Sequence, residues 1–185
     1  RGPDLRGEWE SIDDKLYLGH TRLSIIDLSE EGKQPMHSLN GRYVIVFNGE
    51  IYNYKKLMKQ LNQDFSYNLQ KVSDTRILLE CISSYGLNKT IQIINGMYSF
   101  VIWDKKEKKI YLVRDIYGEK PLFFYHGFDY FVFGSELKVI KSFFNNSLEI
   151  NQESVHLYSC LGYIPAPYSI YKNVYKVLPG EIIEI

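Results

Sequence analysis

The sequence predicts a single α+β domain in which two antiparallel sheets carry a few helices. Three observations support this class: apolar runs of strand length, segments whose apolar residues recur at helical spacing, and a series of short strands separated by turn signals. No internal repeat, low-complexity tract or long linker interrupts residues 1–185. We therefore expect one domain rather than several.

The first half of the chain is predicted to hold strands over residues 16–20 and 43–47, which would belong to the first sheet. A helix is expected to follow residue 53, and another to span residues 75–85, because apolar residues recur there at helical spacing. Ser73 stands just before the second helix and is typical of an N-cap.

The second half is predicted to form a meander of antiparallel strands, which would be the second sheet. These strands are expected at residues 98–103, 110–113, 122–125 and 130–133. A charged turn at residues 104–109 and a turn at Gly127 separate them. Residues 136–142 are expected to form a short helix, after which three prolines break the tail into extended pieces and loops.

Charge and composition exclude several classes of partner. The 22 lysines and arginines balance the 22 aspartates and glutamates, so no overall field attracts nucleic acid or an anionic membrane. No apolar run approaches the roughly 20 residues that a membrane-spanning helix needs. The two cysteines form no disulfide framework, and neither they nor the four histidines have metal-ligand spacing. We expect a soluble, cytoplasmic protein with no metal in this domain.

A strand that ends in polar donors and a carboxylate is the strongest functional signal. Residues 43–47 lead directly into Asn48, Gly49 and Glu50. A side-chain amide and a backbone N–H at a strand end can stabilise an oxyanion, and an adjacent acid can hold an ammonium group. The alternative is that Asn-Gly forms a type I′ hairpin turn, although the helix expected after residue 53 argues against it.

Eight short motifs are distributed over the chain. They are residues 19–27, 34–36, 48–53, 73–75, 114–115, 118–122, 135–138 and 178–180. In this order the motifs resemble the N-terminal glutaminase domain of glutamine-hydrolysing asparagine synthetases. Any one motif alone is weak evidence, whereas the ordered set is strong. The resemblance implies the four-layer αββα sandwich of the N-terminal nucleophile hydrolases.

The resemblance implies that Arg22 binds the α-carboxylate of glutamine, a role that suits the planar fork of a guanidinium. The alternative is a strand arginine in a surface salt bridge, but the apolar residues that follow favour a partly buried charge with a purpose. Backbone groups of the next four residues complete this binding segment. These residues are Leu23, Ser24, Ile25 and Ile26.

The other site residues that the resemblance implies lie at positions 48–50 and 74. Asn48 and Gly49 match the oxyanion hole, through the side-chain amide and the backbone N–H respectively, and Glu50 lies where the family grips the substrate. Asp74 matches the acid that pairs with the α-ammonium group. The alternative for Asp74 is an acid that favours the first turn of a helix by complementing the macrodipole.

The resemblance also implies a cysteine nucleophile at the mature N-terminus, whose own α-amine takes the thiol proton. Cys81 and Cys160 carry no such amine and lie among apolar residues, so both are predicted to be small core side chains. The family's cysteine precedes the segment that matches residues 1–4. We therefore expect the chain to be truncated at both ends and, on its own, not to hydrolyse glutamine.

The family's second half is a covalently linked synthetase domain that activates aspartate with ATP. Its Ser-Gly-Gly phosphate loop does not occur in residues 1–185. The resemblance therefore implies that this domain binds glutamine and no cofactor, and that the synthetase domain binds ATP and Mg²⁺. A homodimer is one expected assembly of the complete protein. Two alternatives stay open: a glutaminase domain that serves another acceptor, such as a sugar or a lactam-forming carboxylate, and a non-catalytic relative that binds glutamine or a partner and regulates.

Overall fold

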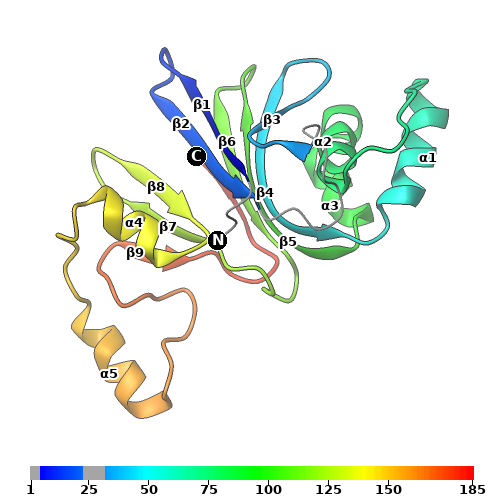
Figure 1. The fold of residues 1–185 in the computed structure, drawn as a ribbon. Helices are drawn as coiled ribbons and strands as arrows, with labels where there is room; N and C mark the ends of the chain where they lie inside the picture. The colour runs from blue at the N-terminus through cyan, green and yellow to red at the C-terminus, as the bar shows by residue number, and fades with distance from the viewer. Residues whose placement is uncertain (1–4, 23–31) are drawn as a thin grey trace. The chain divides into compact units, whose positions relative to one another are not determined.

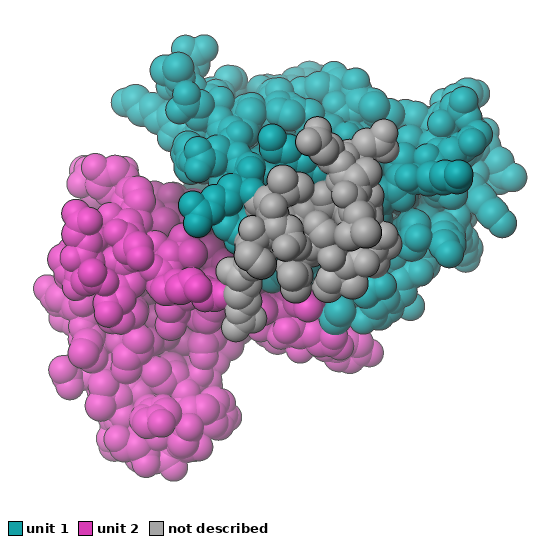
Figure 2. All heavy atoms as spheres, in the orientation of Figure 1, with its two compact units in different colours: residues 1–111, 184–185 teal, residues 112–183 magenta. Residues whose placement is uncertain are grey.

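The computed structural model describes residues 5–22 and 32–185, in which antiparallel strands and short helices alternate as the α+β prediction requires (Figure 1). The chain divides into two compact units (Figure 2). Unit 1 contains residues 1–111 and 184–185, and unit 2 contains residues 112–183. The single domain expected from the sequence stays a prediction. Within the described ranges, every helix is too short or too polar to cross a bilayer.

Unit 1 begins with a hairpin in which β1 (Leu5–Ser11) and β2 (Leu16–Arg22) pair antiparallel. The predicted strand at residues 16–20 is therefore confirmed, and it continues for two more residues. It does not join the strand at residues 43–47, however, because β1 and β2 form a two-stranded sheet of their own. Figure 1 shows this hairpin beside a larger, five-stranded sheet.

The larger sheet has five strands in the order β10-β6-β5-β4-β3. These strands are β3 (Met36–His37), β4 (Tyr43–Ile51), β5 (Gly96–Asp104), β6 (Lys109–Arg114) and β10 (Ile182–Glu184). The placement of residues 43–47 and 98–103 in different sheets was wrong, because β4 and β5 pair along their whole length, from Tyr43 opposite Asp104 to Ile51 opposite Gly96. Such pairing joins distant segments, so local sequence patterns do not reveal it.

Among its described residues, unit 1 contains the helices α1 (Tyr54–Phe65), α2 (Asp74–Tyr85) and α3 (Leu87–Ile93). The first two confirm the predicted helices. Ser73 caps α2 as expected, since its hydroxyl accepts the backbone N–H of Arg76 at 3.2 Å. Ile77 and Leu78 of α2 are fully buried, and α2 packs against β4 (Figure 1). This packing fixes the start of α2 relative to the end of β4.

Unit 2 contains a three-stranded sheet in which β7 (Phe123–His126) lies between β8 (Phe131–Gly134) and β9 (Val174–Lys176). The helix α4 (Leu137–Phe143) follows β8 and confirms the short helix predicted there. The sequence did not predict β9 or α5 (Gln152–Leu161). Figure 1 shows α5 standing apart from this sheet.

Candidate functional site

The polar segment at residues 48–50 lies inside β4 rather than in a turn. Its partners on β5 are Ser99 for Asn48, Tyr98 for Gly49 and Met97 for Glu50. The expected end of the strand at residue 47 and the alternative of an Asn-Gly hairpin turn were therefore both wrong. The ladder with β5 continues because backbone pairing does not require the apolar alternation that the prediction relied on. The polar groups consequently lie on a rigid strand.

Two glycines allow β4 and β5 to approach closely beside this segment. A Cβ atom on Gly49 would lie 2.2 Å from the carbonyl oxygen of Met97 and 2.7 Å from the Cα atom of Tyr98. A Cβ atom on Gly96 would lie 2.1 Å from the carbonyl oxygen of Glu50. The obstructing atoms belong to the backbone, which cannot rotate away as a side chain can. Both positions therefore require glycine.

We expect Gly49→Ala to lower the free energy of unfolding by about 1–3 kcal/mol, the usual range for overpacking. The matched control is Gly19→Ala in β2, where a Cβ atom would meet its nearest neighbour, a side-chain atom of Tyr17, at 3.6 Å. That variant should be neutral. Urea unfolding of both variants measures the difference, and equal stabilities would contradict the close approach of β4 to β5.

Asp74 connects the start of α2 to the end of β4. Its Oδ2 atom accepts the backbone N–H of Ile51 at 3.0 Å, and its Oδ1 atom accepts that of Thr75 at 2.9 Å. Burial raises the pKa of Asp74, the negative charge of Glu50 raises it further, and these two N–H groups oppose the shift. The structure thus brings Asp74 to the same end of β4 as Glu50.

The backbone groups of Phe47 and Ile51 point away from β5. The N–H of Phe47 donates to Oε1 of Gln34 at 2.6 Å, and the carbonyl oxygen of Phe47 lies 3.2 Å from Nε2 of His20. In an antiparallel ladder, the backbone groups of successive residues point to opposite edges of the strand, so those of every second residue share an edge. The N–H of Gly49 therefore points to the same edge of β4 as those of Phe47 and Ile51.

The remaining predicted site residues lie at or beyond the end of β2. Arg22 is the last residue of β2, opposite Leu5, and its side chain is outside the described part of the structure. Leu23, Ser24, Ile25 and Ile26 also lie outside the described residues. Two residues before Arg22, His20 contacts Phe47. This contact brings the end of β2 next to the polar segment of β4.

The two cysteines differ in their surroundings. Cys81 is fully buried in α2, and burial raises the pKa of its thiol to about 12. It is a core side chain, as predicted. Cys160 is exposed on α5, with its Sγ atom 3.7 Å from Nε2 of His156, so its assignment to the core was wrong. The apolar neighbours that suggested burial are themselves largely exposed; they include Tyr158 and Leu161.

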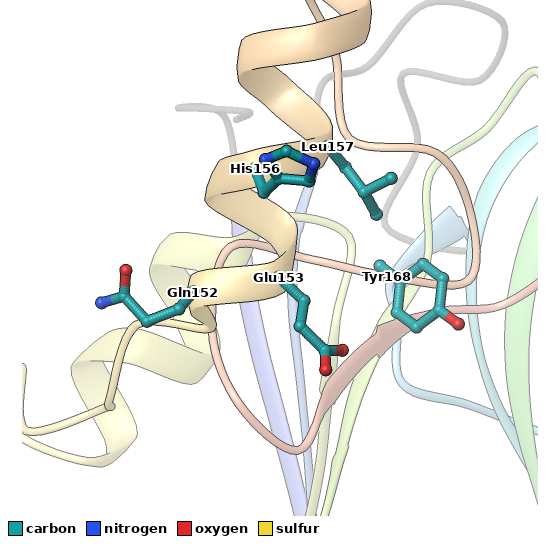
Figure 3. Close-up of a pocket in the computed structure, with 5 residues that line it drawn as sticks. All are labelled: Gln152, Glu153, His156, Leu157 and Tyr168. Carbon is teal, nitrogen blue, oxygen red and sulfur yellow. The ribbon is translucent and has the colours of Figure 1, made fainter.

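A pocket of about 540 Å³ lies in unit 2 and contains none of the predicted site residues. Four residues of α5 and one residue of the following loop line it (Figure 3): Gln152, Glu153, His156, Leu157 and Tyr168. Sequence reasoning missed this pocket because it missed α5. A signal was present, since the side chain of Asn151 accepts the backbone N–H groups of Glu153 and Ser154, and an asparagine followed by an acidic first turn is typical of a helix start.

Comparison with known proteins found a matching family model and similar sequences. Residues 1–185 match the family model described as a glutamine amidotransferase domain. Asparagine synthetase (glutamine-hydrolysing) 1 of Bacillus subtilis is 37% identical over 181 residues, which cover 98% of this chain and 28% of that protein. Amidase chry2 of Gibberella zeae is 36% identical over 191 residues, which cover 98% of this chain and 26% of that protein. The chain thus spans little more than a quarter of the length of these relatives.

Solved structures show the fold. The glutamine phosphoribosylpyrophosphate amidotransferase of B. subtilis, in complex with ADP and GMP, matches 92% of this chain and 33% of its own with a TM-score of 0.63 and 22% identity. This likeness confirms the predicted α+β fold class with antiparallel sheets. Since the family model covers all 185 residues, the chain belongs to the glutamine amidotransferase domain family.

Proposed function

We propose that this domain hydrolyses glutamine to glutamate and ammonia, and that a synthetase domain of the same protein uses the ammonia for the ATP-dependent amidation of aspartate. The observation that carries the proposal is the meeting of residues 48–50 with Asp74 at one end of β4. A small ligand that bears an amide and an ammonium group needs an oxyanion donor and an acid within its own length. The name of the B. subtilis relative supports aspartate as the acceptor.

In this proposal, the amide carbonyl of glutamine lies between the side chain of Asn48 and the N–H of Gly49. A thiolate attacks the carbonyl carbon, the new C–S bond forms, and the carbonyl electrons move to the oxygen, where both donors stabilise the charge. The α-amine of the cysteine, which took the thiol proton, returns it to the amide nitrogen, so that the C–N bond breaks and ammonia leaves as the carbonyl reforms. Water then hydrolyses the thioester. Neither Asn48 nor Gly49 changes its protonation state during these steps.

The groups at the α-carbon of glutamine need different partners. Asp74 accepts two backbone N–H groups, and a carboxylate has roughly four lone-pair sites, so an ammonium group can still bind to it. Glu50 adds a second negative charge beside it. Arg22, with the backbone of residues 23–26, is proposed to bind the α-carboxylate, a role that rests on the sequence resemblance alone.

The thiol in this proposal comes from a cysteine outside residues 1–185. Cys81 is unsuitable because burial raises the pKa of its thiol to about 12, which leaves almost no thiolate at neutral pH. Cys160 lies on α5, whereas the proposed oxyanion donors lie on β4. Neither cysteine has an α-amine beside its sulfur to act as base.

The same proposal assigns no cofactor to this domain and assigns ATP and Mg²⁺ to the synthetase domain. It also includes a cytoplasmic location, which fits a chain whose cysteines form no disulfide framework.

The test is an assay of the complete protein with glutamine, aspartate, ATP and Mg²⁺. We expect glutamate and asparagine to form in equal amounts, because each ammonia released serves one amidation. Release of glutamate without asparagine would rule out aspartate as the acceptor and would leave glutamine hydrolysis intact.

A second candidate is a glutaminase domain that serves another acceptor. This chain is 36% identical to amidase chry2 and 37% identical to the B. subtilis asparagine synthetase, so sequence identity does not favour one acceptor over another. Nitrogen-15 in the amide of glutamine distinguishes the two candidates, since the labelled product identifies the acceptor. Binding of glutamine without any release of ammonia would instead indicate the regulatory relative.

A further inference from the structure

Gln34 holds the edge of β4 immediately before the proposed oxyanion donors. Its side chain is only 7% exposed, and its Oε1 atom accepts the backbone N–H of Phe47 at 2.6 Å. Gln34 itself belongs to no strand and lies two residues before β3. The pairing of β3 with β4 covers only Ile45 and Val44. Beyond Ile45, within the part of the chain that the structure describes, side chains bind this edge of β4 at Phe47 and Ile51.

Two other side chains hold the same edge. Nε2 of His20 contacts the carbonyl oxygen of Phe47, and the carboxylate of Asp74 accepts the N–H of Ile51. Gly49 lies midway between these two held residues. Since Gly49 has no side chain that could lock its conformation, the direction of its N–H depends on β5 and on the residues that flank it.

We propose that Gln34 is a positioning residue for the oxyanion hole, and that it acts by fixing Phe47 so that Asn48 and Gly49 aim at the reacting carbonyl. This inference rests on the function proposed above. A misplacement of donors by about 1 Å is enough to slow a reaction by about 100-fold, because the charge they stabilise develops at one position only. A short hydrogen bond to a buried acceptor limits such movement.

The proposed role has a kinetic signature that a purely structural role lacks. Asn48 and Gly49 act on charge that develops when the thiolate adds to the amide carbonyl, whereas the α-carboxylate and α-ammonium groups are bound equally before and during that step. Loosening Phe47 should therefore lower kcat and leave KM nearly unchanged. General damage to the fold would alter both parameters together.

The main experiment measures glutamine hydrolysis by the complete protein after Gln34→Met, which keeps the length of the side chain and removes the acceptor oxygen. We expect kcat to fall by about tenfold or more with KM within about twofold of its starting value. Gln34→Glu keeps an acceptor for the N–H of Phe47 and should retain most of kcat. The matched control is Gln60→Met on the exposed face of α1, which should change neither parameter.

A second readout uses two ligands of the same pocket. The thiol adds to the carbonyl carbon of the γ-aldehyde analogue of glutamine: the C–S bond forms, the π bond of the carbonyl opens, and the thiol proton passes to the oxygen. That oxygen then lies where the oxyanion would form. Glutamate forms no such bond. Gln34→Met should weaken the aldehyde by the factor by which kcat falls and should leave the affinity for glutamate unchanged. Equal losses for both ligands would overturn the proposal.

Circular dichroism shows whether Gln34→Met folds. If it does not, His20→Phe tests the same inference, because it releases the carbonyl of Phe47, and it too should lower kcat while KM stays constant. An unchanged kcat in a folded variant would refute the positioning role. Asn48→Ala, measured in parallel, distinguishes failure of the proposed function from failure of the role of Gln34. If kcat is unchanged in both variants, the proposed function fails. If kcat falls for Asn48→Ala alone, only the role of Gln34 fails.

Discussion

We expect Asn48→Ala to lower kcat for glutamine hydrolysis by about 100- to 1,000-fold in the complete protein, which corresponds to about 2.7–4 kcal/mol of lost transition-state stabilisation. The amide of Asn48 would donate to an oxygen that becomes charged only when the thiolate adds. Its removal should therefore leave KM almost unchanged. Steady-state measurement of glutamate release gives both parameters.

The control for this variant is Asn88→Ala, an exposed asparagine of α3 that is remote in sequence from the site. It should retain full activity. A rise in KM after Asn48→Ala with an unchanged kcat would mean that Asn48 binds glutamine in its ground state instead of stabilising the oxyanion.

We expect replacement of the N-terminal cysteine of the complete protein by alanine to abolish glutamine-dependent synthesis of asparagine and to leave synthesis from ammonium salt largely intact. Ammonia enters after the thioester step, so a synthetase domain that folds independently does not depend on the thiol. Parallel product assays with glutamine and with ammonium chloride, each with aspartate and ATP, measure the two activities.

The outcome that contradicts this prediction is the loss of both activities in a variant that remains folded. This domain would then contribute to synthesis by more than the supply of nitrogen. Retention of glutamine-dependent synthesis would show that the nucleophile lies elsewhere, and would remove the central step of the proposed mechanism.

The helices of unit 1 could be predicted because their signals are local. In α2, the apolar residues recur every three or four positions, and Ser73 stands where an N-cap is expected. Leu57 and Leu61 of α1 gave the same kind of signal and are both buried. Spacing within one segment is sufficient for such elements, since a helix makes its backbone hydrogen bonds within itself.

The sheets were harder to predict because their partners are distant. β4 pairs with β5, which begins 45 residues after Ile51. The sequence of neither strand indicates which strand it will pair with. α5 was missed for a different reason. Its start carried a helix signal at Asn151, but its apolar residues Val155, Tyr158 and Leu161 are exposed and form no buried stripe beside that signal.

For the site, the motifs predicted Asn48, Gly49, Glu50 and Asp74, and the structure brings Asp74 to the end of β4 that carries the other three. No sequence pattern indicated what Gln34 and His20 do. Both side chains bind backbone groups of Phe47, and a side-chain contact to a distant backbone atom leaves no pattern in the chain. The hydrogen bonds that Asp74 makes to Ile51 and Thr75 escaped detection for the same reason.

The position of Asp74 limits how this domain can be re-engineered. A carboxylate that secures both the last residue of a strand and the first turn of a helix cannot be exchanged to accommodate a different substrate without loosening the scaffold around it. Any redesign of ligand preference would have to begin elsewhere. Glu50 is the more tractable starting point. Its side chain is only half-buried, and the backbone of β4 at this position is already held by pairing with β5. Asp74 is thus fixed by the scaffold, whereas Glu50, whose charge raises the pKa of Asp74, can be changed.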